Sequence, residues 1–128
     1  MNYGIVTRPF LLALILAVSA LAASPVKNAL KAEPQKTAPE KTLLFFMNPN
    51  GWPCQRQLSI LDGISDSLVP LARVIHVKTT NDEDLPKFRQ YGIRGLPFLL
   101  ITDKRGKEIY RFSPGIQPAE TVLKALKK

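Results

Sequence analysis

The chain has 128 residues, with 18 Lys and Arg against 10 Asp and Glu, and a formal net charge of +8. This length predicts one domain, and the single cysteine excludes an internal disulfide, so the domain must be stable through its core alone. The basic balance is typical of some nucleic-acid-binding proteins. No arginine-rich helix or interleaved aromatic pattern accompanies it, however, so we predict no nucleic-acid partner.

Residues 1–23 have the pattern of a secretory signal peptide. Arg8 precedes a continuous apolar run over residues 10–18, and Ala20 and Ala22 provide a small-residue cleavage site. The run is shorter than the about 20 residues that cross a bilayer comfortably. We predict a cleaved signal and export, to the bacterial periplasm. The alternative is an uncleaved signal that anchors the protein to the inner membrane.

Residues 24–41 are rich in Pro, Lys and Ala and show little apolar periodicity. We predict a flexible basic linker, because such a segment has too little to bury to offset its ordering entropy. Membrane contact is expected only through an uncleaved signal or through weak attraction of this linker to anionic lipid. Residues 42–128 are predicted to form the folded domain.

The predicted domain alternates strands and helices. Apolar runs predict strands over residues 42–47, 72–77 and 96–102, and an alternating stretch predicts a hairpin partner over 108–113. Helical spacing and capping signals predict helices over residues 54–68, 82–91 and 118–128. The order β-α-β-α-β-β-α implies a parallel crossover followed by an antiparallel hairpin. We therefore predict an α/β domain with a four-stranded mixed sheet flanked by helices.

The only cysteine, Cys54, follows the first strand and opens the first helix. Gly51 stands three positions before it, where a C-x-x-C pair would need its other cysteine. Pro53 suits the first turn of a helix, because its missing N–H costs nothing there. A lone cysteine in an exported protein suggests a reactive thiol or an intermolecular disulfide.

These motifs resemble thioredoxin. FFMNPNGWPC is followed by ILDGI and later by YGIRGLPFLLITDKRGK, and in that family a strand leads into W-C-G-P-C, a helix with I-L-D-x-[IL], and Y-G-I-R-G-x-P-T. The resemblance covers Thr42 to about Leu126 and implies a thioredoxin-like fold. It also implies that Pro97 is the cis-proline facing the active-site loop. The backbone of Leu96 would then pair with a bound peptide as an extra strand.

Two positions depart from the dithiol mechanism of the family. Gly51 replaces the attacking cysteine, so Cys54 matches the resolving one, and one sulfur cannot perform both steps. Phe45 stands where the family has a buried carboxylate that handles the proton of the resolving cysteine. Lys78 matches the lysine that accompanies that carboxylate. The chain is therefore not expected to be a dithiol oxidoreductase of the C-x-x-C type.

Trp52 and His76 are the other candidate residues. An indole beside a cis-proline groove suits an extended peptide as an apolar platform, and the alternative is a ring folded onto the domain. His76, the only histidine, is expected in the core or at a sheet edge rather than on a metal. We predict no metal site and no cofactor.

Three functions remain open, because a fold does not settle a function. In the preferred one, Cys54 forms mixed disulfides with protein thiols or a small thiol, and a second protein resolves them. In the second, a non-catalytic peptide-binding or adaptor module uses the cis-proline groove and Trp52. In the third, the domain is structural and Cys54 is buried without thiol chemistry. The accessibility of Cys54 in the folded protein separates the first from the other two.

Overall fold

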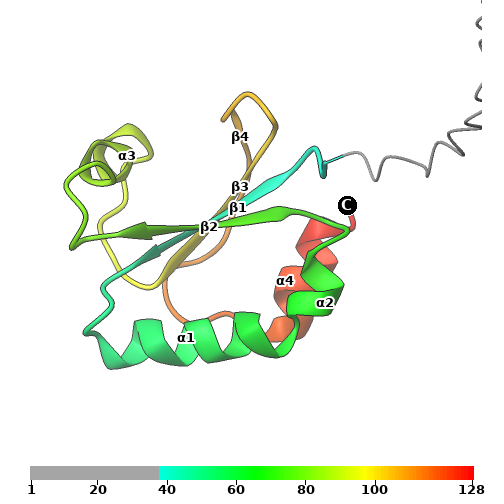
Figure 1. The fold of residues 1–128 in the computed structure, drawn as a ribbon, viewed down its shortest axis with the longest axis horizontal. Helices are drawn as coiled ribbons and strands as arrows, with labels where there is room; N and C mark the ends of the chain where they lie inside the picture. Colours follow the sequence, from blue (N-terminus) through cyan, green and yellow to red (C-terminus); the bar gives the residue numbers. More distant parts are fainter. Residues whose placement is uncertain (1–37) are drawn as a thin grey trace, which may run out of the picture. The chain divides into compact units, whose positions relative to one another are not determined.

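A four-stranded mixed sheet forms the centre of residues 38–128, which are the residues described by the computed structural model (Figure 1). The predicted signal peptide and the greater part of the predicted linker lie outside them. The strand order is β2-β1-β3-β4, with β1 parallel to β2 and the other neighbours antiparallel. The predicted sheet is confirmed. Its strands are β1 (Thr42–Met47), β2 (Arg73–Lys78), β3 (Phe98–Thr102) and β4 (Glu108–Arg111).

Helices cover both faces of the sheet (Figure 1). They are α1 (Trp52–Gly63), α2 (Ser65–Leu68), α3 (Leu85–Gln90) and α4 (Ala119–Leu126). Side chains from α1, α2 and α4 share one hydrophobic cluster with the sheet, whereas α3 packs on the opposite face. None of these helices in residues 38–128 has the length and apolar character of a membrane span.

Strand β1 is buried on both faces, which explains its unbroken apolar sequence. Side chains alternate across a strand, and Leu43, Phe45 and Met47 enter the cluster under α1 and α4. Leu44 and Phe46 enter the second cluster, under α3. All five side chains are buried. A central strand between two helical layers has no solvent face on which a polar residue could lie.

The structure corrects two predicted helices. The helix predicted over residues 54–68 is two helices, α1 and α2, because the backbone at Ile64 leaves the helical region (φ −118°, ψ 17°). Gly63 ends α1, and glycine favours helix less than most other residues. The helix predicted over residues 82–91 begins only at Leu85, because the residues before it form a turn around Asp84.

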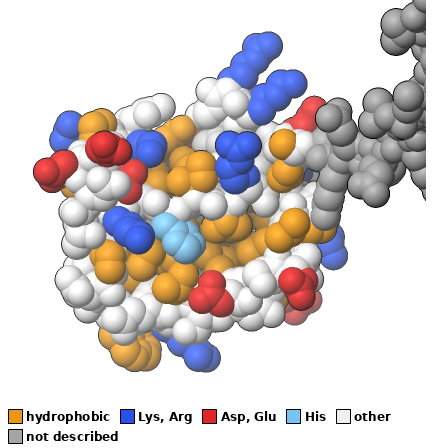
Figure 2. Space-filling model, viewed as in Figure 1, with side chains coloured by type: hydrophobic (Ala, Val, Ile, Leu, Met, Phe, Trp, Pro, Cys, Tyr) orange, Lys and Arg blue, Asp and Glu red, His pale blue; other side chains and the backbone are white. Residues whose placement is uncertain are grey.

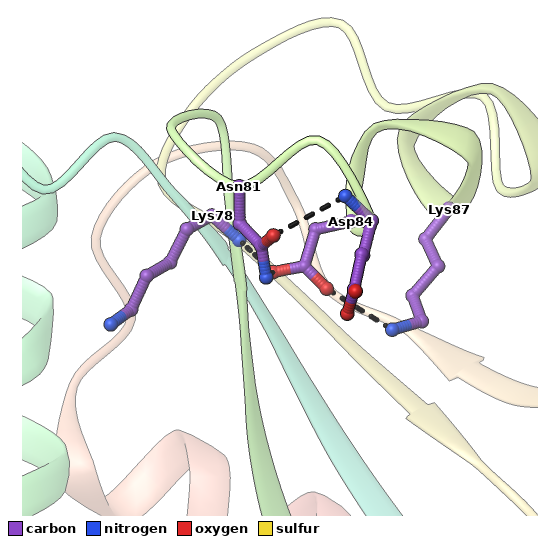
Figure 3. Close-up of polar contacts among 5 residues, drawn as sticks. Lys78, Asn81, Asp84 and Lys87 are labelled. Carbon is purple, nitrogen blue, oxygen red and sulfur yellow. Dashed lines mark hydrogen bonds and ion pairs between the residues drawn. The ribbon is translucent and has the colours of Figure 1, made fainter.

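The turn between β2 and α3 is built on the buried carboxylate of Asp84 (Figure 3), which is only 7% exposed. One of its oxygens accepts the backbone N–H of Lys78 at 3.0 Å and the amide of Asn81 at 3.2 Å. The other accepts the ammonium group of Lys87 at 3.1 Å. These bonds, led by that of the Lys78 backbone, hold the pKa of Asp84 below its ordinary value. The carboxylate therefore joins the end of β2 to the start of α3.

Candidate functional site

The loop after β1 and the segment before β3 meet at one end of the sheet. The antiparallel register pairs Phe46 with Phe98, so the residues after Met47 lie beside Leu96 and Pro97. The Leu96–Pro97 peptide bond is cis. Pro97 is fully buried, and its carbonyl accepts the N–H of Gly115 at 3.1 Å. This arrangement places the candidate site residues of both segments at the same sheet end.

Cys54 is buried in the core and only 2% exposed. Its side chain belongs to the cluster that contains Phe45 and Leu61, under α1. The backbone N–H of Asn48 donates to Cys54 Sγ at 3.3 Å. The sulfur therefore lies in the first turn of α1, facing the sheet and bonded to the preceding loop.

Gly51 forms the N-cap of α1 and leaves room for a side chain next to this sulfur. Its backbone is extended (φ −86°, ψ 126°), which any L-residue can adopt. A Cβ atom there would lie 3.4 Å from the carbonyl oxygen of Asn48 and 3.8 Å from Cys54 Sγ, both ordinary contacts. The absence of a cysteine at position 51 therefore has no steric cause in this backbone.

We expect Gly51→Cys to form a disulfide with Cys54 in air. The Cβ atom of residue 51 would lie 3.8 Å from Cys54 Sγ. This distance is only about 1 Å longer than the Cβ–S distance across a disulfide bond. The expected readout is the loss of both free thiols, reversed by dithiothreitol. Gly63→Cys is the matched control, because Gly63 has open space around it and lies about 13 Å along α1 from Cys54. Two persistent thiols in a folded Gly51→Cys variant would contradict the geometry.

The apolar ring of Phe45 lies in the same buried cluster as Cys54. It is completely buried and meets the imidazole of His76 edge-on, with ring centroids 5.6 Å apart. Lys78 is exposed at the end of β2. Within residues 38–128 the one buried carboxylate is Asp84, which caps that strand end. The thiol is thus surrounded by apolar side chains, with no buried acid in its cluster.

Trp52 is the most exposed large hydrophobic residue of the described chain, at 71%. It is the first residue of α1, and Pro53 beside it is also exposed. The indole is not folded onto the domain. Because α1 directs Cys54 toward the sheet, the neighbouring Trp52 projects toward solvent.

Leu96, the residue before the cis-proline, presents its backbone N–H and C=O at this end of the sheet. Its half-buried side chain packs against both hydrophobic clusters. The strand pairing of β3 begins at Phe98, and within residues 38–128 neither the N–H nor the C=O of Leu96 has a hydrogen-bond partner. These two groups can pair with an added chain.

Gln57 was missed by the sequence analysis. It is completely buried, its amide donates to the carbonyl of Gln117 at 3.1 Å, and its amide oxygen accepts the Gln117 N–H at 2.6 Å. These bonds fasten α1 to the loop before α4. Its spacing of i+3 from Cys54 was the available signal, since residues three apart share a helix face.

The parallel crossover, the terminal hairpin, and a helix-start cysteine at the sheet end that carries a cis-proline together define a thioredoxin-like fold. The family model for the thioredoxin-like domain matches residues 26–128, and the chain belongs to that family. No curated protein sequence matches it. In residues 38–128, no group of three or more potential metal ligands lies together.

Solved structures of thioredoxin-like proteins share this fold. A thioredoxin-fold protein from Helicobacter pylori superposes with a TM-score of 0.60 at 20% identity, covering 70% of each chain. The exposed lipoprotein thioredoxin of Streptococcus pneumoniae has the same score and identity, covering 70% of this chain and 85% of its own. A Thermus thermophilus thioredoxin is 24% identical, with a TM-score of 0.57 and coverage of 69% and 72%. Identities this low establish the fold alone.

Proposed function

We propose that this chain is a peptide-binding module, in which Trp52 and the backbone of Leu96 hold an extended segment of a partner protein. The observation that carries the proposal is the contrast within one turn of α1. Trp52 is 71% exposed, whereas Cys54 is 2% exposed. A surface on which the indole is exposed and the sulfur is buried is suited to binding rather than to thiol chemistry.

The physical basis is strand addition. The N–H and C=O of Leu96, which have no partner within residues 38–128, can form two backbone hydrogen bonds with an extended chain. Each bond contributes about 1 kcal/mol net. An exposed indole adds a large apolar contact area and buries little polar surface. Such contacts depend on the shape of the bound segment and need no sulfur.

A thiol-free unfolded protein, S-carboxymethylated α-lactalbumin, provides the test. Trp52→Ala is expected to weaken its binding about 10-fold or more, because buried indoles are frequent binding hot spots. Trp52→Phe should retain most of the affinity, and Cys54→Ser should leave it unchanged. Binding that survives Trp52→Ala, or that is lost in a folded Cys54→Ser variant, would overturn the proposal. Isothermal titration calorimetry measures all three.

A second candidate, a mixed disulfide at Cys54, has one observation in its favour. Gly51 places no side chain over the sulfur, and the space that a Cβ would fill lies 3.8 Å from Sγ. In this reaction the Cys54 thiol gives its proton to solvent, and the thiolate attacks a partner disulfide. A new S–S bond forms, and the partner's other sulfur leaves as a thiolate. The sulfur must first become exposed, and a thiol of a second protein would later release the partner.

We further propose that the protein is exported through residues 1–23 and acts in the bacterial periplasm. The basic start, the apolar run and the small-residue cleavage site support this location. Anchoring to the inner membrane by an uncleaved signal is the alternative. In either case the binding partners would be extended segments of exported proteins.

A further inference from the structure

Strand β2 lies at one edge of the sheet. The backbone N–H and C=O groups of every second residue in it therefore point away from the other strands. The N–H of Arg73 donates to the carbonyl of Lys41 at 2.9 Å, and that of Thr79 donates to Met47 at 3.0 Å. In a parallel pair, the residues that bond to the neighbouring strand alternate along the chain. Odd-numbered residues of β2 therefore bond to β1, and even-numbered residues direct their backbone groups outward.

One of these outward positions is already occupied. The N–H of Lys78 donates to the Asp84 carboxylate at 3.0 Å (Figure 3). This bond confirms the outward direction, and it means that the Lys78 N–H is not available to an added strand. Val74 and His76 remain. Within residues 38–128, neither has a hydrogen-bond partner outside the pairing of β2 with β1. The edge thus offers two N–H groups and two C=O groups to an added strand.

A groove lies on the sheet face to which these two residues point. It has a volume of about 460 Å³ and runs between β2, the helices α1 and α2, and Pro39 in the segment before β1. Figure 2 looks onto the β2 edge of the sheet, with hydrophobic side chains gathered around the pale blue histidine. The apolar side chains of its wall are those of Pro39, Leu61, Leu68, Val69, Ala72 and Val74.

The groove carries a carboxylate suited to a cation. Asp62 of α1 lines it and has no ion pair within the described part of the chain. Arg73, at the start of β2, also lines it. Partial burial of the ring lowers the pKa of His76 below its usual 6.5, and Lys78 adds to this shift while Asp62 opposes it. Asp62 is the one carboxylate among the residues that line the groove, so a basic side chain of a bound segment would lie next to it.

We propose that an extended segment of a partner protein joins β2 as a fifth strand, bonding to Val74 and His76. One groove-facing side chain of this segment is apolar and enters the groove. Another, two positions away, is basic and lies next to Asp62, because every second residue of a strand shares a face. This surface is separate from the Trp52 surface, since Trp52 and Asp62 lie about 15 Å apart along α1.

A synthetic peptide, acetylated and amidated, tests the proposal. It alternates threonine with valine and lysine, so that valine and lysine lie on one face. We expect it to shift the amide resonances of Val74 and His76. Asp62→Lys should weaken its binding about 5-fold or more, because attraction becomes repulsion. Asp66→Lys is the matched control, since Asp66 is exposed on α2 and does not line the groove.

Two further measurements make the test decisive. Strand pairing predicts that N-methylation of the edge-facing peptide amides abolishes binding and that methylation of the alternate amides does not. Val69→Asp, on the groove wall, should weaken binding about 10-fold. Trp52→Ala should have no effect here. Peptide binding that depends on Trp52 but not on Asp62 would overturn this proposal and support the proposed function. A dimer that Val69→Asp dissociates, with no peptide binding, would show that a second copy occupies the edge and overturn it too.

Discussion

Iodoacetamide is expected to alkylate Cys54 in the native domain at least about 10³-fold more slowly than in the unfolded chain. The sulfur is 2% exposed and packed in the cluster under α1, so it reacts only after local opening. A 10³-fold reduction corresponds to an opening free energy of about 4 kcal/mol. Mass spectrometry of samples quenched over time gives the rate, and urea should accelerate the reaction.

The matched control moves the thiol to an exposed position on the same helix. Ser59 is exposed on α1, and the double variant Cys54→Ser/Ser59→Cys keeps one cysteine per chain. We expect this cysteine to react at nearly the rate of the unfolded chain. A native Cys54 that reacts as fast would make the mixed disulfide the better of the two functions. Slow alkylation, together with unchanged peptide binding in Cys54→Ser, leaves the Trp52 surface as the working site.

Asp84→Ala is expected to lower the free energy of unfolding by about 2–3 kcal/mol. The carboxylate accepts three hydrogen bonds, from a backbone N–H, an amide and an ammonium group. A hydrogen bond to a charged group contributes about 1.5–3 kcal/mol. Removing it also leaves the Lys78 N–H without its partner. Urea denaturation measures the loss. Asp82→Ala is the control, because Asp82 is exposed in the same loop.

The loss of stability caused by Asp84→Ala is expected to depend on pH. The folded-state pKa of Asp84 lies below its ordinary value of 3.8, chiefly through the Lys78 N–H. Its contribution is therefore fully present above pH 3.8 and is lost as the pH falls through the lower, folded-state pKa. The stability difference between the wild type and Asp84→Ala should shrink in that acid window. A constant difference from neutral pH down to the acid limit would contradict this role of the carboxylate.

The two proposals concern two surfaces at opposite ends of α1. Near its start, Trp52 is exposed at the sheet end where the Leu96 backbone has no hydrogen-bond partner within residues 38–128. Near its end, Asp62 lines the groove beside β2, the edge strand of the sheet in residues 38–128. Both surfaces offer backbone groups together with apolar contacts, the combination used by strand-adding peptide sites. A peptide that carries both segments tests whether one partner spans both surfaces. Its affinity is measured for Trp52→Ala and for Asp62→Lys, and a partner that spans both surfaces should bind each variant more weakly.

Local sequence patterns were sufficient to predict the sheet. The unbroken apolar run of β1 indicated a strand buried on both faces, and the alternation around Tyr110 indicated a hairpin strand. These predictions succeeded because strand periodicity and turn chemistry depend on neighbouring residues. That the chain has glycine, and not a second cysteine, three positions before Cys54 was equally readable, since it requires only the identity of one residue.

Exposure was decided by the tertiary structure. Cys54, Gln57 and Leu61 are buried because the face of α1 that carries them packs on the sheet, whereas Trp52 is turned to solvent by the same rotation. Helical spacing put Gln57 on the same face as Cys54 and Leu61, but a polar side chain there gave no indication that it would be buried. The cap formed by Asp84 also joins segments that the sequence does not show as partners. Burial and long-range hydrogen bonds depend on which elements meet in space, and a linear pattern does not contain that information.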